Sequence, residues 1–466
     1  MKGKYHLSPL EIRWQRFFRE LKHSRFGLKV LQRMPQRIRD NMPYEAIPLW
    51  IASVLTGLVS VFYEKLFEWF EKGGEAIFHH NPYLIFVSAP VFMLLGWFLV
   101  DKYDKNSGGS GIPQLMAAVE IAGTRRARAV NILLSIKTIV IKISSSCLIL
   151  LGGGAIGREG PTLQISGSIF HTVYRFIPDG WAKVSHKIMI ITGGASGLAA
   201  AFNTPLGGIV YVVEELTKSH IGKFRTAVFS AVIISGMSAQ LFLGSYLYLG
   251  YPKLNPMPLT GIVWVILLSV ISGYAGALFS KILLYINKLR KQVNKRSHQI
   301  LVVLLLSLSF ATLVFFAGTF TMGTGKPLIN RILFEPGELP WYMFPARFFG
   351  SVLTFSVGGA GGIFATSLSS GASLGHFLVN FLNITGSYHN LLVLVCMIGF
   401  LTGVTRSPFT AAILVLEMTD RHSAIFYFLL AGTVSNLAAG QLMSGSFYEI
   451  QKESFLRKIR SIRIPK

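Results

Sequence analysis

The sequence is poor in charged residues. Asp, Glu, Lys and Arg make up only 14% of its 466 residues, whereas soluble proteins contain about 25%. Hydrophobic residues account for 51%, and the mean hydropathy is +0.51. This composition excludes an ordinary soluble globular protein and places the chain in a lipid bilayer.

Cysteine is also scarce. The chain has two, Cys147 and Cys396, and each lies in an apolar segment. Two such cysteines provide neither a disulfide framework nor a metal-binding cluster, so we expect both to be small buried hydrophobic residues. The 11 histidines show no i, i+4 pairing. The sequence therefore predicts no metal site and no cofactor.

Acidic residues are few, at 21 against 45 Lys and Arg, which gives a net charge of +24. Such an excess can indicate nucleic-acid binding. Here the basic residues gather at the ends of apolar segments, in residues 1–44, 288–296 and 451–466. We therefore expect no nucleic-acid partner. The positive-inside rule predicts that all three segments are cytoplasmic.

We also expect no cleavable signal peptide, because the first apolar run starts near residue 46 and not within about the first 15–30 residues. No long polar linker interrupts the chain after that point. The sequence therefore predicts an all-α polytopic membrane protein with one transmembrane domain over residues 45–450. The apolar runs that can cross, or nearly cross, a hydrocarbon core of about 30 Å include Ile47–Phe62, Leu84–Val100, Gly261–Ser280 and Ile425–Leu442.

The two halves of this domain, about 45–250 and 259–450, resemble each other. Residues 153–161 (GGAIGREGP) align with residues 358–366 (GGAGGIFAT), and Pro205–Glu214 aligns with Pro408–Glu417. Close packing of small residues in membranes explains scattered glycines, but not matched blocks that contain Pro and Glu at a preserved spacing. Glycine-rich interruptions at corresponding positions are typical of inverted-repeat transporters, whose broken helices form the substrate site.

Three glycine-rich turns lie within these apolar surroundings: residues 109–113 (GSGIP), 157–161 (GREGP) and 361–365 (GGIFA). Glycine permits a sharp turn, proline is tolerated in the first turn of a helix, and the free N–H groups of a helix N-terminus bind anions. Converging helix ends, each with a partial charge of roughly +0.5, suit an anion that must also leave. The candidate anion-binding residues in these turns are Ser110, Gly111, Ile112, Arg158, Gly160, Ile363 and Phe364.

Glu159 is the first candidate for a gate. A carboxylate among anion-binding amides competes with the anion when it is ionised and loses that attraction when it is protonated. An ionisable group within a membrane is a functional candidate by default. The alternative is a structural pair between Arg158 and Glu159, but adjacent residues on a helix point in different directions.

Gly152, Gly154 and Gly157 also fit the dinucleotide-binding pattern G-x-G-x-x-G. The soluble strand–turn–helix unit that this pattern requires is missing, and Glu159 would repel a pyrophosphate. An intramembrane enzyme that uses Glu159 and Glu215 as acid and base is a further alternative. No nucleophile, metal set or polar substrate pocket accompanies them, so we expect no enzyme.

The three turns, in this order, resemble the signatures GSGIP, GREGP and G-x-F-x-P of the CLC family of chloride channels and chloride/proton antiporters. Residues 109–113 and 157–161 match letter for letter, and residues 203–206 (NTPL) followed by Glu214 and Glu215 resemble the next motif. The resemblance spans about residues 45–450. It implies an inverted-repeat bundle with broken, tilted helices, and a homodimer with one pore per subunit. It also implies a prokaryotic member without CBS domains, in the bacterial inner membrane.

The resemblance also implies roles for single residues. The hydroxyls of Ser110 and Tyr448 would touch a central chloride, which the backbone amides of Ile363 and Phe364 would complete. Ser110 in the first motif resembles the chloride-preferring members. For Tyr448 the alternative is an aromatic residue at the membrane interface.

The proton route follows from the same resemblance. Glu159 would be the external gate and proton acceptor, and Glu215 would be the internal proton-transfer residue, a position that is usually apolar in the channels. This favours chloride/proton antiport over a passive chloride channel of the same fold, and the intact GSGIP argues against a fluoride exporter. Thr366 replaces the proline of the third signature, and we expect it to cap the helix there.

Overall fold

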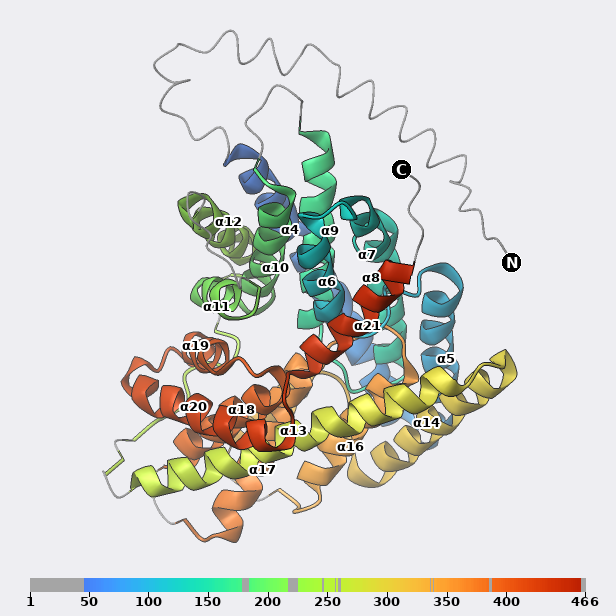
Figure 1. The fold of residues 1–466 in the computed structure, drawn as a ribbon. Helices are drawn as coiled ribbons and strands as arrows, with labels where there is room; N and C mark the ends of the chain where they lie inside the picture. The colour runs from blue at the N-terminus through green and yellow to red at the C-terminus, as the bar shows by residue number, and fades with distance from the viewer. Residues whose placement is uncertain are drawn as a thin grey trace.

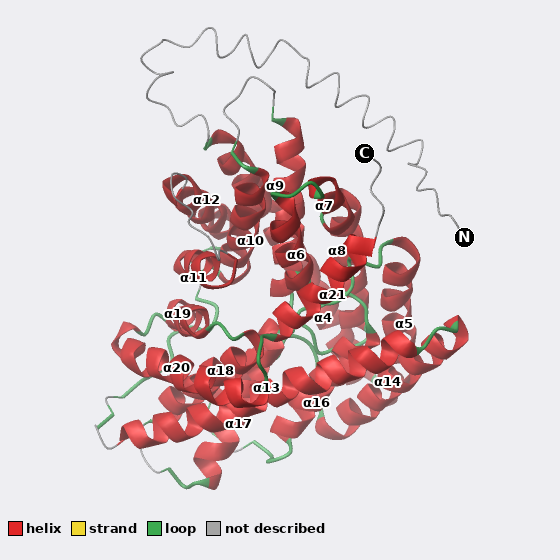
Figure 2. Cartoon of the chain, viewed as in Figure 1, coloured by secondary structure: helices red, strands yellow, loops and turns green. Residues whose placement is uncertain are grey.

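The computed structural model describes residues 46–177, 184–216, 225–244, 247–255, 257–258, 261–335, 337, 339–384 and 388–461. The predicted cytoplasmic segment 1–44 and the last five residues of the predicted tail lie outside these ranges. Within the described chain, helices and connecting loops make up the fold, and two isolated β-bridges are the only strand-like pairings (Figure 2). The predicted all-α fold is confirmed.

Seven described helical segments are long and apolar enough to cross a membrane. All four apolar runs singled out in the sequence coincide with such segments, except that Gly261 is the N-cap and not part of its helix. The helices that contain Ile47–Phe62 and Gly261–Ser280 continue beyond these runs to His80 and Gln292. The longest, α4 and α13, have 34 and 31 residues. Short helices, which cannot span a bilayer, separate the long ones, as expected for broken helices.

The first half of the chain supplies the upper part of the view in Figure 1, apart from α5, which lies beside α14. Its helices are α4 (Ile47–His80), α5 (Ile85–Tyr103), α6 (Ile112–Ala122), α7 (Val130–Leu133), α8 (Ile136–Leu151), α9 (Glu159–Phe176), α10 (His186–Phe202), α11 (Pro205–Tyr211) and α12 (Arg225–Leu243).

The second half fills the lower part of the same view, and α21 crosses the boundary between the halves (Figure 1). Its helices are α13 (Ile262–Gln292), α14 (Arg296–Ala317), α15 (Lys326–Phe334), α16 (Met343–Val357), α17 (Phe364–Phe381), α18 (His389–Thr405), α19 (Pro408–Thr419), α20 (Ile425–Leu442) and α21 (Phe447–Ser461).

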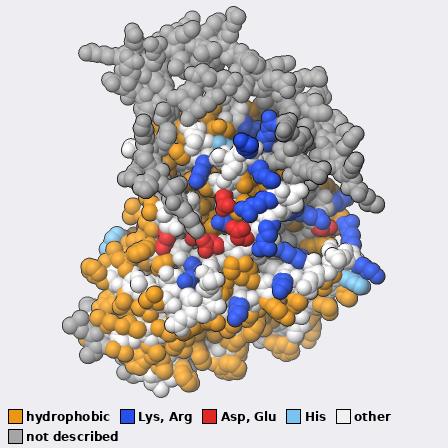
Figure 3. All heavy atoms as spheres, viewed as in Figure 1, with side chains coloured by type: hydrophobic (Ala, Val, Ile, Leu, Met, Phe, Trp, Pro, Cys, Tyr) orange, Lys and Arg blue, Asp and Glu red, His pale blue; other side chains and the backbone are white. Residues whose placement is uncertain are grey.

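The exposed surface of the long helices is apolar. On α14, Leu305 and Phe316 are 55% and 77% exposed, and hydrophobic side chains cover the lower part of the molecule in Figure 3. Lys and Arg side chains gather instead on the face around α21 (Figure 3). A broad apolar surface with basic residues on one side is the arrangement that a bilayer requires.

Helix α18 is buried along almost its whole length and packs against α13, α17 and α20. The packing of α13 depends on small residues. A Cβ atom at Gly276 would meet the backbone of Phe400 and Gly403 on α18, and one at Gly273 would lie 2.7 Å from the carbonyl oxygen of Ser435 on α20. Within a membrane the hydrophobic effect does not drive helices together. Small residues let the helix backbones approach closely, so that packing can hold the helices together.

The matched blocks of the two halves cap each other's helices. The Glu417 carboxylate accepts hydrogen bonds from the backbone N–H groups of Leu206 (3.0 Å) and Gly207 (2.6 Å) at the start of α11. In the same way, Glu214 accepts from Phe409 (3.1 Å) and Thr410 (2.6 Å) at the start of α19. The preserved Pro-to-Glu spacing therefore has a physical cause, since each carboxylate satisfies N–H groups of the opposite half.

Each half also contains one pair of contacting histidines, which the sequence analysis did not predict. The ring nitrogens of His171 and His186 lie 2.7 Å apart and join α9 to α10. Those of His376 and His389 lie 3.0 Å apart and join α17 to α18. The partners are far apart in sequence, so a search for i, i+4 pairs cannot find them. No cluster of three potential metal ligands occurs among the described residues.

Candidate anion pathway

The three glycine-rich turns meet at the boundary between the halves. Backbone hydrogen bonds join Gly109 to Gly359 (2.7 Å) and Gly361 to Gly109 (3.2 Å), and two more join Gly157 and Gly362 (2.8 and 2.7 Å). Gly109 has a φ of +65°, which a residue with a Cβ adopts only with strain. The turns are therefore held together by backbone pairing, which fixes the relative positions of the helices that follow them.

Each turn leads into a helix N-terminus, as the sequence predicts. Helix α6 begins at Ile112, α9 at Glu159 and α17 at Phe364, and none of the three N-caps makes a side-chain hydrogen bond to its helix. The first N–H groups of a helix have no partner within it and carry partial positive charge. Three uncapped helix ends thus present N–H groups where the turns converge.

The predicted role of Thr366 is wrong. The N-cap of α17 is Ile363, and Thr366 is the third residue of the helix, where its hydroxyl donates to the Ile363 carbonyl oxygen at 3.2 Å. A threonine hydroxyl that bonds backward inside a helix cannot also cap the N-terminus. The proline of the family pattern is therefore replaced by a residue that leaves the helix end uncapped.

Ser110 and Tyr448 lie together at this site. Their side chains are 2% and 1% exposed, and neither hydroxyl makes a hydrogen bond of normal geometry within the described chain. The Tyr448 hydroxyl faces Ser110 and lies within electrostatic range of Glu159 and Glu215. The burial of Tyr448 excludes the alternative of an interfacial aromatic. Buried hydroxyls without a hydrogen bond of normal geometry are rare in proteins and require an explanation, such as a bound ion.

The backbone around Ser110 leaves no space for larger residues. A Cβ atom at Gly160 would lie 2.9 Å from the Ser110 carbonyl oxygen, and one at Gly111 would lie 2.9 Å from the Lys142 ammonium nitrogen. Gly160 is the second residue of α9, so the start of this helix packs directly on the Ser110 turn. The predicted candidates Gly111, Ile112 and Gly160 are thus brought to one place.

The second-half residues lie opposite. Ile363 and Phe364 are 1% and 2% exposed, and the Phe364 ring packs against Phe202 with its centroid 5.5 Å away. A Cβ atom at Gly362 would lie 3.1 Å from the backbone nitrogen of Gly160. The starts of α9 and α17, one from each half, are therefore in direct contact.

The Glu159 carboxylate is completely buried at the start of α9. Both of its oxygens lack a hydrogen bond of normal geometry within the described chain, although they lie against the backbone N–H groups of Glu159 and Ala365. A Cβ atom at Gly157 would meet Glu159 Oε2. The side chain therefore occupies the point where the helix ends converge.

Arg158 does not pair with Glu159. Its guanidinium forms an ion pair with Glu64 of α4 at 2.7 Å, and both side chains are more than nine-tenths buried. Arg158 also donates to the Ala201 carbonyl oxygen at 3.3 Å. This result excludes the structural pair considered from the sequence. It also means that the Arg158 side chain, a predicted anion ligand, carries a charge already balanced by Glu64.

Sequence reasoning missed two buried charges near the site, Glu64 and Lys142. Lys142 is fully buried in α8, and its ammonium donates to the Gly109 carbonyl oxygen at 3.0 Å. Its side-chain nitrogen therefore lies directly against the Ser110 turn. Both residues could have been found by the rule that identified Glu159, since each is an ionisable side chain within an apolar segment.

Glu215 lies in a π-helical turn, Val212–Leu216, that follows α11. Its carboxylate accepts a hydrogen bond from the Ser407 hydroxyl at 2.7 Å, and it lies within electrostatic range of Tyr211 and Tyr448. Single-turn π-helices are frequent at functional sites. Tyr448 is therefore near Ser110 and near both candidate proton carriers, Glu159 and Glu215.

Comparison with solved structures supports the same fold. A structure described as that of a slow cyanobacterial Cl⁻/H⁺ antiporter matches with a TM-score of 0.75 at 22% identity, over 90% of this chain and 99% of the other. A CLC-type fluoride/proton antiporter matches at 0.73 and 19% identity, over 92% and 99%. A eukaryotic CLC transporter matches at 0.69 and 19% identity, over 89% and 74%.

A comparison with protein families identifies the chain itself. The profile described as "Voltage gated chloride channel" matches residues 91–440, which include the three turns and all predicted site residues except Tyr448. The chain belongs to this family, the CLC family of chloride transport proteins.

Proposed function

We propose that the protein exchanges chloride for protons across the membrane, with Glu159 as the gate of the anion pathway and the external proton acceptor. The observation that carries this proposal is the position of the Glu159 carboxylate, buried without a conventional hydrogen bond where the uncapped ends of α6, α9 and α17 converge. Ionised, it is a tethered anion that occupies the site; protonated, it loses its attraction for the helix ends and yields to chloride.

Coupling to protons requires a second station, and we assign this role to Glu215. Its hydrogen bond to Ser407 and its proximity to Tyr448 support a carboxylate that exchanges protons with the opposite side of the membrane. The similar structures described as Cl⁻/H⁺ and fluoride/proton antiporters agree with exchange, and the GSGIP turn favours chloride. A passive chloride channel of the same fold is the alternative, because the gate alone does not require Glu215.

The test is simultaneous measurement of chloride and proton movement in proteoliposomes. We expect an outward chloride gradient to drive protons against their own gradient in the wild-type protein. Glu159→Gln should keep chloride flux and abolish proton movement, whereas Glu68→Gln, an exposed carboxylate on α4, should behave as wild type. Chloride flux without any proton movement in the wild type would establish the channel instead.

The remaining assignments follow from the family and from the charge distribution. We propose a homodimer with one pathway per subunit in a bacterial inner membrane, with both termini in the cytoplasm. The transmembrane domain would cover residues 45–450 between basic segments 1–44 and 451–466. Cross-linking in native membranes, followed by mass determination of the product, tests the dimer. We expect a product with twice the mass of the monomer, and the monomer mass alone would contradict the proposal.

A further inference from the structure

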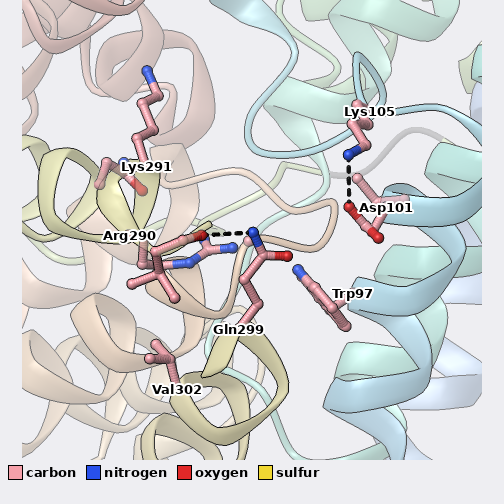
Figure 4. Close-up of a pocket in the computed structure, with 11 residues that line it drawn as sticks. Trp97, Asp101, Lys105, Arg290, Lys291, Gln299 and Val302 are labelled. Atoms are coloured by element: carbon pink, nitrogen blue, oxygen red, sulfur yellow. Dashed lines mark hydrogen bonds and ion pairs between the residues drawn. The ribbon is translucent and has the colours of Figure 1, made fainter. Parts of the chain in front are cut away.

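A cavity of about 310 Å³ lies between α5, α13 and α14 (Figure 4), and its wall includes Gly358, which precedes the third glycine-rich turn. It is separate from the groups that surround Glu159. Its size is at the lower end of the range of small-molecule sites, roughly 300–1,000 Å³. Its walls are Trp97, Val100, Asp101, Lys105, Asn287, Arg290, Lys291, Val293, Gln299, Val302 and Gly358.

The charges in this cavity do not balance. Asp101 is its one acidic wall residue, and it is already paired with Lys105 at 3.0 Å and with Arg296 at 3.8 Å. The Lys291 ammonium donates to the Ser454 hydroxyl of α21 at 2.9 Å, a neutral partner. The half-buried Arg290 guanidinium has no hydrogen bond or ion pair with any described residue. The Arg290 guanidinium thus borders the cavity without a counter-charge, and Lys291, whose side chain points away toward α21, adds a second positive charge at the wall (Figure 4). This balance favours an anionic ligand.

The hydrogen-bond donors suit a phosphate group. The guanidinium presents several N–H groups in a planar fork that matches phosphate oxygens. Figure 4 shows Trp97, Arg290 and Gln299 around the same space. Trp97 is only 4% exposed, and its indole N–H has no partner in the described chain. A halide would need neither this volume nor donors on opposite walls.

The cavity also touches the backbone that forms the anion site. The Arg290 guanidinium packs on Gly358, where an added Cβ atom would strike it, and the next residue, Gly359, accepts the hydrogen bond from Gly109 at 2.7 Å. Lys291 reaches Ser454 on α21, the helix that carries Tyr448. The wall residues of the cavity are therefore connected both to the backbone of the third glycine-rich turn and to α21.

We propose that this cavity binds a phosphate monoester group from the cytoplasm and that occupancy slows anion transport. The free cations raise the local concentration of anions near the cytoplasmic side of the pathway. A bound phosphate cancels this positive potential and holds the Gly358 loop through Arg290, so chloride access falls. The phosphate belongs either to a soluble compound or to a lipid headgroup.

Binding is tested with inorganic phosphate on the purified full-length protein at constant ionic strength. We expect a saturable rise in the thermal unfolding temperature of the wild type. Arg290→Gln should weaken the apparent affinity by about tenfold or more. The matched control is Lys288→Gln, which removes one charge from the same helix outside the cavity wall and should bind as wild type. Lys291→Gln serves as a second test variant if Arg290→Gln fails to fold.

Transport is tested in proteoliposomes that contain phosphatidylcholine alone, with or without inorganic phosphate, or phosphatidylcholine with phosphatidic acid. We expect phosphate to slow wild-type chloride flux by roughly twofold to fivefold and to leave Arg290→Gln unaffected. Slowing by phosphatidic acid alone would assign the site to a lipid headgroup. Equal effects of phosphate on wild type and Arg290→Gln, in the unfolding or the flux measurement, would overturn the proposal.

Discussion

Arg347 shows how this chain accommodates a charge in the membrane domain. The side chain is completely buried in α16, and it donates to the Ser369 hydroxyl and to the carbonyl oxygens of Thr321, Met322 and Gly323 at 2.6–2.9 Å. A buried charge is tolerated when its hydrogen bonds are satisfied. The buried Glu159 carboxylate lacks such hydrogen bonds of normal geometry, and this is why we place the gate there.

The buried pair between Glu64 and Arg158 should be essential for stability. Glu64→Gln leaves the Arg158 guanidinium inside the protein without its counter-charge, which costs about 3–5 kcal/mol in comparable buried pairs. We expect a clear fall in the thermal unfolding temperature of the purified protein. The control is Glu68→Gln, one turn further along α4, whose exposed pair with Lys65 at 3.9 Å should contribute less than about 1 kcal/mol. Similar losses in both variants would contradict this role for the buried pair.

Ser407 should affect protons more than chloride. Its hydroxyl donates to Glu215 at 2.7 Å, and a hydrogen bond to a charged group contributes about 1.5–3 kcal/mol. Ser407→Ala should therefore lower proton movement in proteoliposomes by about tenfold while chloride flux stays within about twofold. Ser307→Ala, which removes a buried hydroxyl on α14 that donates to the Leu304 carbonyl, is the control. A parallel fall of both fluxes in Ser407→Ala would show a structural role instead.

At single positions, the sequence predicts which residues are special better than it predicts what they touch. Glu159, Ser110 and Glu215 stand out because polar or acidic residues are rare in apolar turns. The Arg158 partner did not stand out, because Glu64 is almost a hundred positions away and the pair exists only once α4 and α9 pack together. Local motifs cannot encode a contact that depends on the packing of distant helices.

At the level of helices, the reciprocal caps of α11 and α19 join the two halves. Glu214→Gln and Glu417→Gln each keep an acceptor oxygen but lose the charge that faces a helix N-terminus. We expect each variant to lose about 1–2 kcal/mol of stability, measured as a lower thermal unfolding temperature. Each carboxylate accepts from two backbone N–H groups at nearly the same distances, so both variants should lose stability. The loss should be somewhat larger in Glu214→Gln, because Glu214 also accepts from the Thr410 hydroxyl at 2.7 Å.

The control for this pair is Glu120→Gln. Glu120 is a half-exposed carboxylate paired with Lys452 at 3.1 Å, so its charge should contribute less than about 1 kcal/mol. A large loss of stability in one cap variant and none in the other would mean that only one of the two caps stabilises the protein.

Long apolar helices were predictable because a span of about 20 apolar residues has few alternatives in lipid. The starts of α6, α9 and α17 were predictable for a different reason, since glycine and proline mark helix starts. The missing cap at Thr366 and the π-turn around Glu215 were not predictable. Both depend on how the neighbouring helices constrain the backbone, which composition and spacing do not record.

At the scale of the whole molecule, polar contacts near the end of α5 relate this helix to the basic connections of the chain. Asp101, near the end of α5, pairs with Arg296 at the start of α14 at 3.8 Å, so this end of α5 lies beside the basic connection between α13 and α14. Near the end of α21, Lys458 donates to Asn106 at 3.4 Å. Asn81, before α5, is therefore on the opposite side of a 19-residue helix, a length of about 28 Å that spans the hydrocarbon core.

This geometry and the positive-inside rule together predict the topology. The two native cysteines are buried, at 2% and 0% exposure, so single added cysteines can be labelled without removing them. In intact cells, a membrane-impermeant maleimide should label Asn81→Cys but neither Lys288→Cys nor Arg460→Cys. In inside-out vesicles the pattern should reverse. Labelling of Lys288→Cys from outside would place the basic connections, and with them the phosphate cavity, on the extracellular face, where a cytoplasmic ligand could not reach it.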